Sequence, residues 1–411
     1  MTSTTAPDVY YDPYDYDVDV DAQAVWKRMR DESPVYRNEQ FDFYALSRYD
    51  DVLPAMLDTE TYSSAHATTI ELMGPERMTV PMMIWMDPPD HTRFRKLVSR
   101  AFTPRAIADL EDRVRRLCAT LLDPYVGQEG FDYVDRFAAL LPPTVILALL
   151  GFPEGHAGEW RLGIDKMFHH ERGETGFKVS EEGIPADLRS DGSVGTVLLE
   201  MLPEIMEQRR RHPTDDLISA LVNSEIEDDD GTTRPVTALE FEMFIQMLAI
   251  AGTETVARLL SWTAVILARN PDERARVAVD PALAANAIEE LLRYEAPSPV
   301  NARWVTRDVR FHDTTIPEGS KLILLNGAAN RDERHFADPD QFDVRRTIDR
   351  HLSFGYGTHF CIGAALARLE SRIALQETLA RFPTWDIVDD ELEWVHTSTV
   401  RGFANVPIHL P

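Results

Sequence analysis

The 411-residue chain contains only two cysteines, Cys118 and Cys361. A disulfide framework needs more cysteines than this, and a zinc or iron–sulfur site built on four of them is excluded by the count alone. Cys118 lies among residues that favour helix, so we expect it to fill a core position as a small apolar side chain. Cys361 has different neighbours, and its chemistry must be that of a single thiol.

Positive charge is also scarce. The chain has 42 lysines and arginines against 69 aspartates and glutamates, which gives a formal net charge of -27. A charge of this sign and size repels the phosphate backbone of nucleic acids and the anionic surface of a membrane. We therefore predict that neither nucleic acid nor membrane is a partner.

Long uninterrupted apolar runs are missing. The longest run, residues 137–152, is broken by Pro142 and Pro143 and is too short to span a bilayer. The acidic, tyrosine-rich N-terminus lacks the basic start and apolar core of a secretory signal. With 44% hydrophobic and 27% charged residues, the composition is that of a globular protein. We expect a cytoplasmic protein that acts as a monomer.

Helical patterning, by contrast, is abundant. Thr237 and Glu240 have the spacing of a capping box, and no proline follows until Pro271. This predicts a helix of roughly 30 residues, about 45–50 Å long. A helix that is apolar around most of its circumference has to pass through the middle of a large domain. We therefore predict one domain over residues 1–411.

Two other helices and a few strands are expected. The helices cover about 281–294 and the stretch from just after Gly363 to about 382, and the clearest strands cover 41–46 and 321–325. Short strands are also expected near the C-terminus. The fold class is therefore mainly α, with small sheets at the periphery.

The segment 354–363, F-G-Y-G-T-H-F-C-I-G, places the thiol of Cys361 in a glycine-rich loop that opens into a helix. The glycines let the backbone turn N–H groups toward the sulfur, and the helix points its positive end at the same atom. Both effects favour the thiolate. Such a thiolate is either a metal ligand or a nucleophile. Without a partner cysteine, the choice is between haem iron and covalent catalysis.

The same segment resembles the haem-binding signature of the cytochromes P-450, in particular the soluble bacterial enzymes, at every fixed position. The resemblance implies that Cys361 is the axial ligand to the iron of haem b. It also implies that Phe354 shields the sulfur, His359 binds a haem propionate, and Gly363 lets the helix pass close to the porphyrin. The implied fold is a triangular prism of about a dozen or more helices, with the haem buried in its centre.

A second motif interrupts the long apolar helix. Gly252 in mid-helix costs about 1 kcal/mol relative to alanine, and the carboxylate of Glu254 costs more unless it is paired or solvated. These two unfavourable residues suggest a functional cause, although a kink with a surface-facing Glu254 remains the alternative. The family carries an acid–alcohol pair here, matched by Glu254 and Thr255, with Ala251 and Gly252 next to the haem. A hydroxyl beside a carboxylate can hold a water and relay the protons needed to split dioxygen, the co-substrate.

Further motifs follow the family in the same order along the chain. Glu290 and Arg293 match its E-x-x-R pair and share one helical face, although this spacing alone would indicate an ordinary surface pair. Arg303 matches the family arginine that binds a propionate. His91 and Arg95 stand four residues apart at the start of an expected helix, and the resemblance gives them propionate contacts as well.

Electrons have to come from elsewhere, because the chain has no flavin-binding motif and too few cysteines for an iron–sulfur cluster. We expect a ferredoxin and its NAD(P)H-dependent ferredoxin reductase as partners. Between His91 and Arg105 there are basic residues and no acidic one. Three of them, Arg93, Lys96 and Arg100, are our candidates for docking an acidic electron donor.

The substrate pocket is predicted from position in the family. Its expected residues are mostly apolar, with Asn301 as a polar anchor. They are Met82, Met83, Ile84, Met247, Ile250, Pro299, Val300, Asn301 and Val400. This composition predicts a hydrophobic small molecule: a fatty acid, terpenoid, steroid or polyketide-like compound. The Phe-His-His-Glu segment at 168–171 is interpreted as an exposed loop near the substrate entrance rather than a metal site.

Three alternatives compete with a monooxygenase. A peroxygenase would keep the haem, but enzymes of that kind commonly lack the acid–alcohol pair, and a non-enzymatic haem carrier or sensor would have no use for it. A hydrolase would use Cys361 as nucleophile and His359 as base, but two residues apart in a loop these side chains need not meet. We therefore predict a haem-thiolate monooxygenase.

Overall fold

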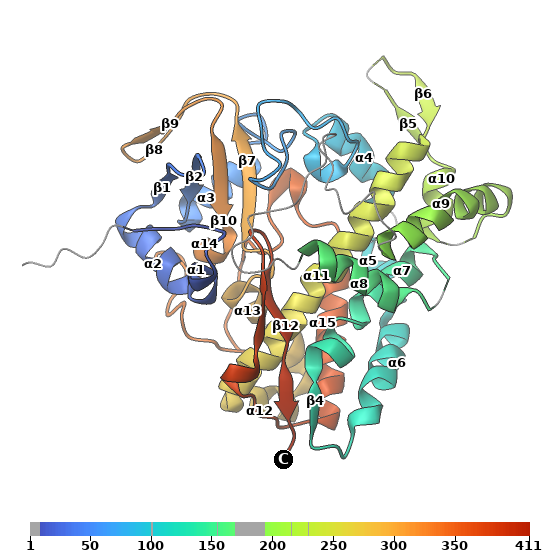
Figure 1. Ribbon diagram of the computed structural model, residues 1–411, viewed down its shortest axis with the longest axis vertical. Helices are drawn as coiled ribbons and strands as arrows, with labels where there is room; N and C mark the ends of the chain where they lie inside the picture. The colour runs from blue at the N-terminus through green and yellow to red at the C-terminus, as the bar shows by residue number, and fades with distance from the viewer. Residues whose placement is uncertain (1–8, 100–101, 154, 169–193, 215, 229) are drawn as a thin grey trace, which may run out of the picture.

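The structure, a computed structural model, describes residues 9–99, 102–153, 155–168, 194–214, 216–228 and 230–411. Helices predominate, as predicted. They are α1 Tyr16–Val20, α2 Ala22–Glu32, α3 Tyr49–Leu57, α4 Asp90–Ser99, α5 Pro104–Ala108, α6 Glu111–Leu122, α7 Leu141–Leu150, α8 Ala157–Phe168, α9 Val194–Arg211, α10 Leu217–Val222, α11 Ala238–Arg269, α12 Pro271–Val279, α13 Ala284–Tyr294, α14 Asn326–Ala329 and α15 Ala364–Arg381. Figure 1 shows most of them on one side of the largest sheet, with α1, α2, α3 and α14 on the other side.

The long central helix is α11, which runs diagonally through the molecule with α15 beside it (Figure 1). The predicted capping box is present: the Thr237 hydroxyl accepts from the backbone N–H of Glu240, whose carboxylate accepts from the N–H of Thr237. By length and composition α11 is apolar enough to cross a membrane, but 78% of its apolar window is buried inside the protein. It is therefore the core helix that the sequence predicts.

The other two predicted helices are also present. Residues 281–283 form a short 3₁₀ turn, after which α13 continues to Tyr294. The helix after Gly363 is α15, which ends at Arg381. Cys118 lies on α6 with no exposed surface, and burial raises the pKa of its thiol to about 12. It is therefore a core residue, as expected.

The largest sheet has five strands in the order β1-β2-β10-β7-β3. Its strands are β1 Val35–Asn38, β2 Phe43–Leu46, β3 Tyr62–Ser63, β7 Val300–Val305 and β10 Lys321–Leu325. The predicted strands correspond to β2 and β10, which pair in parallel, while β7 lies antiparallel on the other side of β10. Strand β7 was not predicted from the sequence, because Val300 and Asn301 were assigned to the wall of the substrate pocket.

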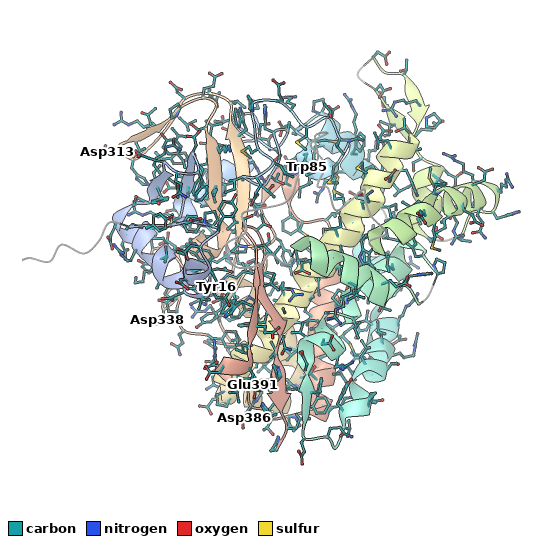
Figure 2. All side chains as sticks on the ribbon, viewed as in Figure 1. Tyr16, Trp85, Asp313, Asp338, Asp386 and Glu391 are labelled. Atoms are coloured by element: carbon teal, nitrogen blue, oxygen red, sulfur yellow. The ribbon has the colours of Figure 1, made fainter. Side chains whose placement is uncertain are left out.

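Four two-stranded sheets complete the structure, and two of them involve the C-terminus. They are β4 Gly130–Asp132 with β13 Pro407–His409, β5 Glu225–Glu227 with β6 Thr233–Pro235, β8 Val309–Phe311 with β9 Thr314–Ile316, and β11 Glu393–His396 with β12 Arg401–Asn405. Figure 2 shows Asp386 and Glu391 at the end of the molecule near the C-terminus, where both contact His409. The expected strands near the C-terminus are therefore present.

Glu290 and Arg293 form a fully buried ion pair on α13, with 0% of either side chain exposed. The guanidinium donates from Nε and Nη2 to the two carboxylate oxygens at 2.7 and 2.8 Å. Its Nη1 donates to the carbonyls of Asn330 and Pro339, and Arg346 adds a second guanidinium 3.0 Å from Glu290. The pair thus ties α13 to two distant loops, which an ordinary surface pair would not do.

Candidate active site

A cavity of about 280 Å³ lies between α11 and the loop that precedes α15. The residues that α11 contributes recur at helical spacing, which marks one face of the helix. They are Met247, Leu248, Ala251, Gly252, Thr255, Val256 and Leu259. On the opposite side lie Phe354, Cys361 and Gly363. The cavity therefore brings together two motifs that are about 100 residues apart in the sequence.

The loop around Cys361 is closed by a backbone hydrogen bond of 2.8 Å from the N–H of Cys361 to the carbonyl of Phe354. Gly355 and Gly357 adopt φ angles of 65° and 73°, which side chains disfavour. Burial raises the pKa of the Cys361 thiol, while the N–H groups of Gly363 and Ala364 and the charge of Arg95 lower it. The N–H groups of Gly363 and Ala364 thus favour the thiolate, as the sequence predicts, while burial opposes it.

Four basic side chains converge at one edge of this cavity: His91, Arg95, Arg303 and His359. The two imidazole rings are 4.2 Å apart, and burial lowers the pKa of His91 to about 4 and that of His359 to about 2. Burial also lowers the pKa of Arg303 to about 10. Arg95 donates to the carbonyls of Thr358 and Phe360 in the cysteine loop. The protein thus gathers cationic and donor groups at a buried place.

Three of these groups lack partners that buried polar atoms require. Among the described residues, His91 Nδ1 and His359 Nε2 have no hydrogen-bond partner. Arg303 forms no ion pair with any carboxylate of the same residues, and the only hydrogen bond of its guanidinium is to the carbonyl of Ala302. A group with two carboxylates at one edge and a flat apolar body would satisfy all of them, with the Cys361 sulfur below it. The residues present therefore fit haem.

No hydrogen bond joins His359 to Cys361 in the described part of the chain, and the His359 ring lies against His91 instead. A cysteine nucleophile would need its base within hydrogen-bond reach. Within the same residues there is also no cluster of three or more His, Cys, Asp or Glu side chains that could hold a metal ion. The arrangement favours a single thiolate ligand over the hydrolase alternative.

Thr255 and Glu254 point in different directions from α11, because successive helical residues are about 100° apart. The Thr255 hydroxyl faces the cavity and donates to the carbonyl of Ala251 at 2.8 Å, which leaves its oxygen able to accept from a water. Glu254 is absent from the cavity lining and is only 2% exposed. Its carboxylate is 2.9 Å from the guanidinium of Arg258, one turn along the helix. The surface-facing Glu254 of the alternative interpretation is therefore wrong.

Gly252 has a packing reason of its own. A β-carbon at this position would lie 3.0 Å from Ile146 Cγ1 on α7, so the Ile146 side chain would have to shift to make room for it. Gly252 and Ala251 both line the cavity, as predicted. The close contact between α7 and α11 thus explains in part why the helix carries a glycine at position 252 despite its low helix propensity.

The predicted pocket residues divide into two groups. Met83, Ile84, Met247 and Asn301 line the cavity, whereas Met82, Ile250, Pro299, Val300 and Val400 do not. On β7, Asn301 and Arg303 share the cavity face, so Val300 points the other way into the core beside β2 and β10. Ile250 lies off the lining face of α11, because residues on one face of a helix recur every three or four positions and Ile250 falls between the lining residues.

The predicted pocket residues that do not line the cavity lie in two other places. Pro299, Val300 and Val400 border a separate, much smaller hollow against the N-terminal segment. Met82 precedes the 3₁₀ turn of Met83–Trp85 and packs into the core. Figure 2 shows Trp85, which ends this turn, near α4. Of the two methionines predicted for the pocket, Met83 lies in the 3₁₀ turn and lines the cavity, whereas Met82 does not, and sequence position alone does not reveal this difference.

Of the predicted docking residues, Lys96 is exposed on α4, whereas Arg93 is 24% exposed and 3.0 Å from Asp90. Arg100 lies outside the described residues, and so do His169, His170 and Glu171 of the expected entrance loop. The structure therefore adds support for Lys96 as a free surface cation, while Arg93 already has a carboxylate beside it.

Sequence reasoning missed Glu370 on α15, a cavity-lining carboxyl that is 1% exposed. Its Oε2 has no hydrogen-bond partner in the part of the chain that the structure describes, and burial raises the pKa of the carboxyl well above the usual range. The signal was its spacing: Leu366 and Ala367, four and three residues earlier, line the same cavity.

Replacing Glu370 by glutamine is expected to change the pH dependence of stability. In the folded protein the carboxyl keeps its proton at pH values where the unfolded chain, with a pKa near 4.5, has released it. The wild type therefore loses free energy of unfolding as the pH rises above that value, by up to about 1.4 kcal/mol per pH unit. The gap between Glu370→Gln and wild type should widen from pH 5 to 7 in urea titrations. Parallel pH profiles would mean that Glu370 is ionised in the folded protein.

Known proteins resemble this chain in sequence and in fold. A cytochrome P450 family profile matches residues 281–404. The chain is 40% identical over 405 residues to a putative cytochrome P450 123 of Mycobacterium tuberculosis, covering 98% of this chain and 97% of that protein. It is 34% identical to the 6-deoxyerythronolide B hydroxylase of Saccharopolyspora erythraea, covering 99% of each. The solved cytochrome P450 CYP109Q5 from Chondromyces apiculatus superimposes with a TM-score of 0.84 at 32% identity, covering 97% of this chain and 98% of that one. The chain therefore belongs to the cytochrome P450 family of monooxygenases, which use haem b and dioxygen.

Proposed function

We propose that this protein, as one domain over residues 1–411, hydroxylates a hydrophobic small molecule with Cys361 as the axial ligand of its haem. The observation that carries the proposal is a single cavity with the Cys361 thiol on one side and the Thr255 hydroxyl on the other. His91, Arg95, Arg303 and His359 would hold the two propionates at its edge. When bound, haem supplies the reductive activation of dioxygen at its iron.

The protein's own contribution is to position protons and exclude water. The Thr255 oxygen can accept from one water in the cavity, and the apolar side chains of α11 around it keep further water out. Glu254 is the proposed source of protons for this water. To reach it, the carboxylate has to leave Arg258, so its supply of protons depends on a change of rotamer.

Replacing Thr255 by alanine is expected to uncouple reductant use from product formation. The variant keeps the thiolate and the propionate contacts, but the water loses its hydrogen-bond partner. Product formed per NAD(P)H should fall by about tenfold or more, with hydrogen peroxide released instead. Stopped assays that measure NAD(P)H, product and peroxide together would show the shift.

The matched control is Thr263→Ala. Thr263 lies on the same helix and donates to a carbonyl four residues back at 2.8 Å, as Thr255 does, but it does not line the cavity. This variant should remain as well coupled as wild type. Normal coupling in Thr255→Ala would rule out the proton relay.

We further propose a cytoplasmic protein that receives electrons from a ferredoxin and its NAD(P)H-dependent reductase, with docking around Lys96 on α4. Lys96 is exposed, and it lies on the helix that also carries His91 and Arg95 to the cavity edge. A negatively charged ferredoxin would be repelled by much of a chain with a net charge of -27, and an exposed cation near the cavity edge would attract it. Lys96→Glu should slow reduction by ferredoxin at low ionic strength without changing the spectrum.

The experiment that tests the proposed function is the absorption spectrum of the purified wild-type protein, first ferric and then reduced under carbon monoxide. A strongly red-shifted Soret band in the carbon monoxide complex is expected, because a thiolate ligand donates electron density to the iron. A band typical of histidine ligation would indicate a carrier or sensor instead. A haem-free protein after cofactor-supplemented expression would overturn the proposal.

A further inference from the structure

Two residues of α11 just before Thr255 are each held by a neighbouring helix. Gly252 lies against Ile146 of α7. Thr253 accepts a hydrogen bond of 3.1 Å from the indole N–H of Trp160 on α8. We propose that Trp160 is a positioning residue for the proton relay, because its N–H holds the turn of α11 that presents Thr255 to the cavity. This inference rests on the proposed function and adds to it a residue that lies outside the cavity.

The hydrogen bond between Trp160 and Thr253 is buried, with the two residues 5% and 3% exposed. An indole N–H can only donate, so in a buried place it needs an acceptor. The Thr253 hydroxyl uses its one proton to donate to the carbonyl of Ala249 at 2.7 Å, which leaves its oxygen free to accept from Trp160. Each side chain therefore supplies what the other requires, and α8 is tied to α11 at one defined atom.

The turn of α11 at this point is weakly determined by the helix itself. Thr255 donates to the carbonyl of Ala251 in the same way as Thr253 donates to that of Ala249. Hydroxyls that bond to a carbonyl four residues earlier compete with the helix ladder and often bend a helix. Gly252, with its low helix propensity, lies between the two threonines. The exact path of this turn therefore depends on the contacts that neighbouring elements make with it.

Trp160 acts from the side of α11 that faces away from the cavity. Thr253 and Thr255 are two residues apart, which is about 200° around a helix, so they point to nearly opposite sides. Thr255 belongs to the cavity lining, whereas Thr253 and Trp160 do not belong to the lining that the structure describes. A contact at this place should therefore change the direction of the Thr255 hydroxyl without touching substrate or haem.

The helix that carries Trp160 is itself fixed. The next residue, Arg161, lies 2.9 Å from the carboxylate of Asp135 and also donates to the Asp135 carbonyl at 3.1 Å. Asp135 belongs to the π-helical turn Val134–Ala138, and α8 also packs against α7, α9 and α11 (Figure 1). Trp160 therefore projects from an anchored helix, as a positioning residue must.

The test replaces Trp160 by phenylalanine, which keeps an aromatic ring and removes the N–H. Amide hydrogen exchange of the holoenzyme, read on peptides that cover residues 249–256, should become about fivefold faster, as expected when one buried neutral hydrogen bond is lost. Peroxide released per NAD(P)H should rise about threefold, which lies within the range of one such bond. The probe for this assay is whichever of testosterone, decalin and dodecane gives wild type the largest haem spin-state shift.

The matched control is Trp385→Phe. Trp385 is 2% exposed, and its indole N–H donates at 3.0 Å to the carbonyl of Ala264, which is also on α11. Neither residue belongs to the described cavity lining. This variant loses a comparable hydrogen bond, so it should become less stable. Its exchange over 249–256 and its peroxide yield should nevertheless stay at the wild-type values.

The acceptor side of the bond provides a second check. Thr253→Val should reproduce the effects of Trp160→Phe, and the double variant should be little worse than either single one, because both remove the same interaction. Thr253→Ser keeps the hydroxyl and should restore most of the wild-type exchange and peroxide yield. A purely structural role of the side-chain volume would not be rescued in this way.

Wild-type exchange or peroxide yield in Trp160→Phe, equal changes in Trp385→Phe, or no rescue by Thr253→Ser would each overturn the inference. The reduced carbon monoxide spectrum of the same samples distinguishes this failure from failure of the proposed function. A thiolate band in every variant together with any of these results overturns the positioning role alone. Absence of that band in wild type overturns the proposed function, and the inference with it.

Discussion

Replacing Cys361 by serine is expected to abolish the red-shifted carbon monoxide band and to lower turnover to background. Cys361 is the cavity-facing thiol, and its sulfur receives N–H groups from Gly363 and Ala364 and the field of Arg95. A serine oxygen would occupy nearly the same place, but its alkoxide is far too basic to serve as an anionic donor at neutral pH. The measurement is the reduced carbon monoxide spectrum together with the haem content per chain.

Cys118→Ser provides the matched control, because Cys118 is the other of the two cysteines in the chain. It is buried on α6, away from the cavity, and burial keeps its thiol protonated. This variant should lose some stability through a buried hydroxyl, but its folded fraction should give the wild-type spectrum. Retention of the thiolate band in Cys361→Ser would contradict Cys361 as the ligand.

The parts of the site that the sequence predicted correctly are those with a fixed local spacing. The capping box at Thr237 located the start of α11 to within a residue, and the cysteine motif located the start of α15. The E-x-x-R pair has a geometry set by the helix itself. For these features the sequence pattern and the contact depend on the same few neighbouring residues.

The parts that it did not predict depend on where a backbone turns. Whether Met82 or Met83 faces the cavity depends on a 3₁₀ turn, and whether Val300 or Asn301 does depends on a strand that was not identified. The direction of Glu254 depends on Arg258, which takes its carboxylate away from Thr255. Glu370 escaped notice because its spacing from Leu366 and Ala367 becomes informative only when these residues are known to line a cavity between distant segments.

Breaking the Glu290–Arg293 pair from one side is expected to have the largest effect on stability. Glu290→Ala would leave Arg293 buried and would deprive Arg346 of its 3.0 Å carboxylate contact. Removal of one partner of a buried pair costs about 3–5 kcal/mol. A globular protein has a total free energy of unfolding of only about 5–15 kcal/mol. Arg293→Ala should be comparably harmful, since it also frees the carbonyls of Asn330 and Pro339.

Urea denaturation, followed by circular dichroism and haem absorbance, would measure the effect, with Arg28→Ala as the control. Arg28 and Glu32 on α2 form an ion pair of 2.9 Å, a distance similar to the 2.7 Å of the buried pair. The side chains of Arg28 and Glu32 are both well exposed. Exposed pairs contribute little, so this variant should unfold at the wild-type urea concentration. The comparison separates burial from ion pairing: equal shifts for Glu290→Ala and Arg28→Ala would mean that desolvation is not what makes the E-x-x-R pair important. A large shift for the buried pair alone would mean that α13 is held to its two loops by a charge network that cannot lose one member.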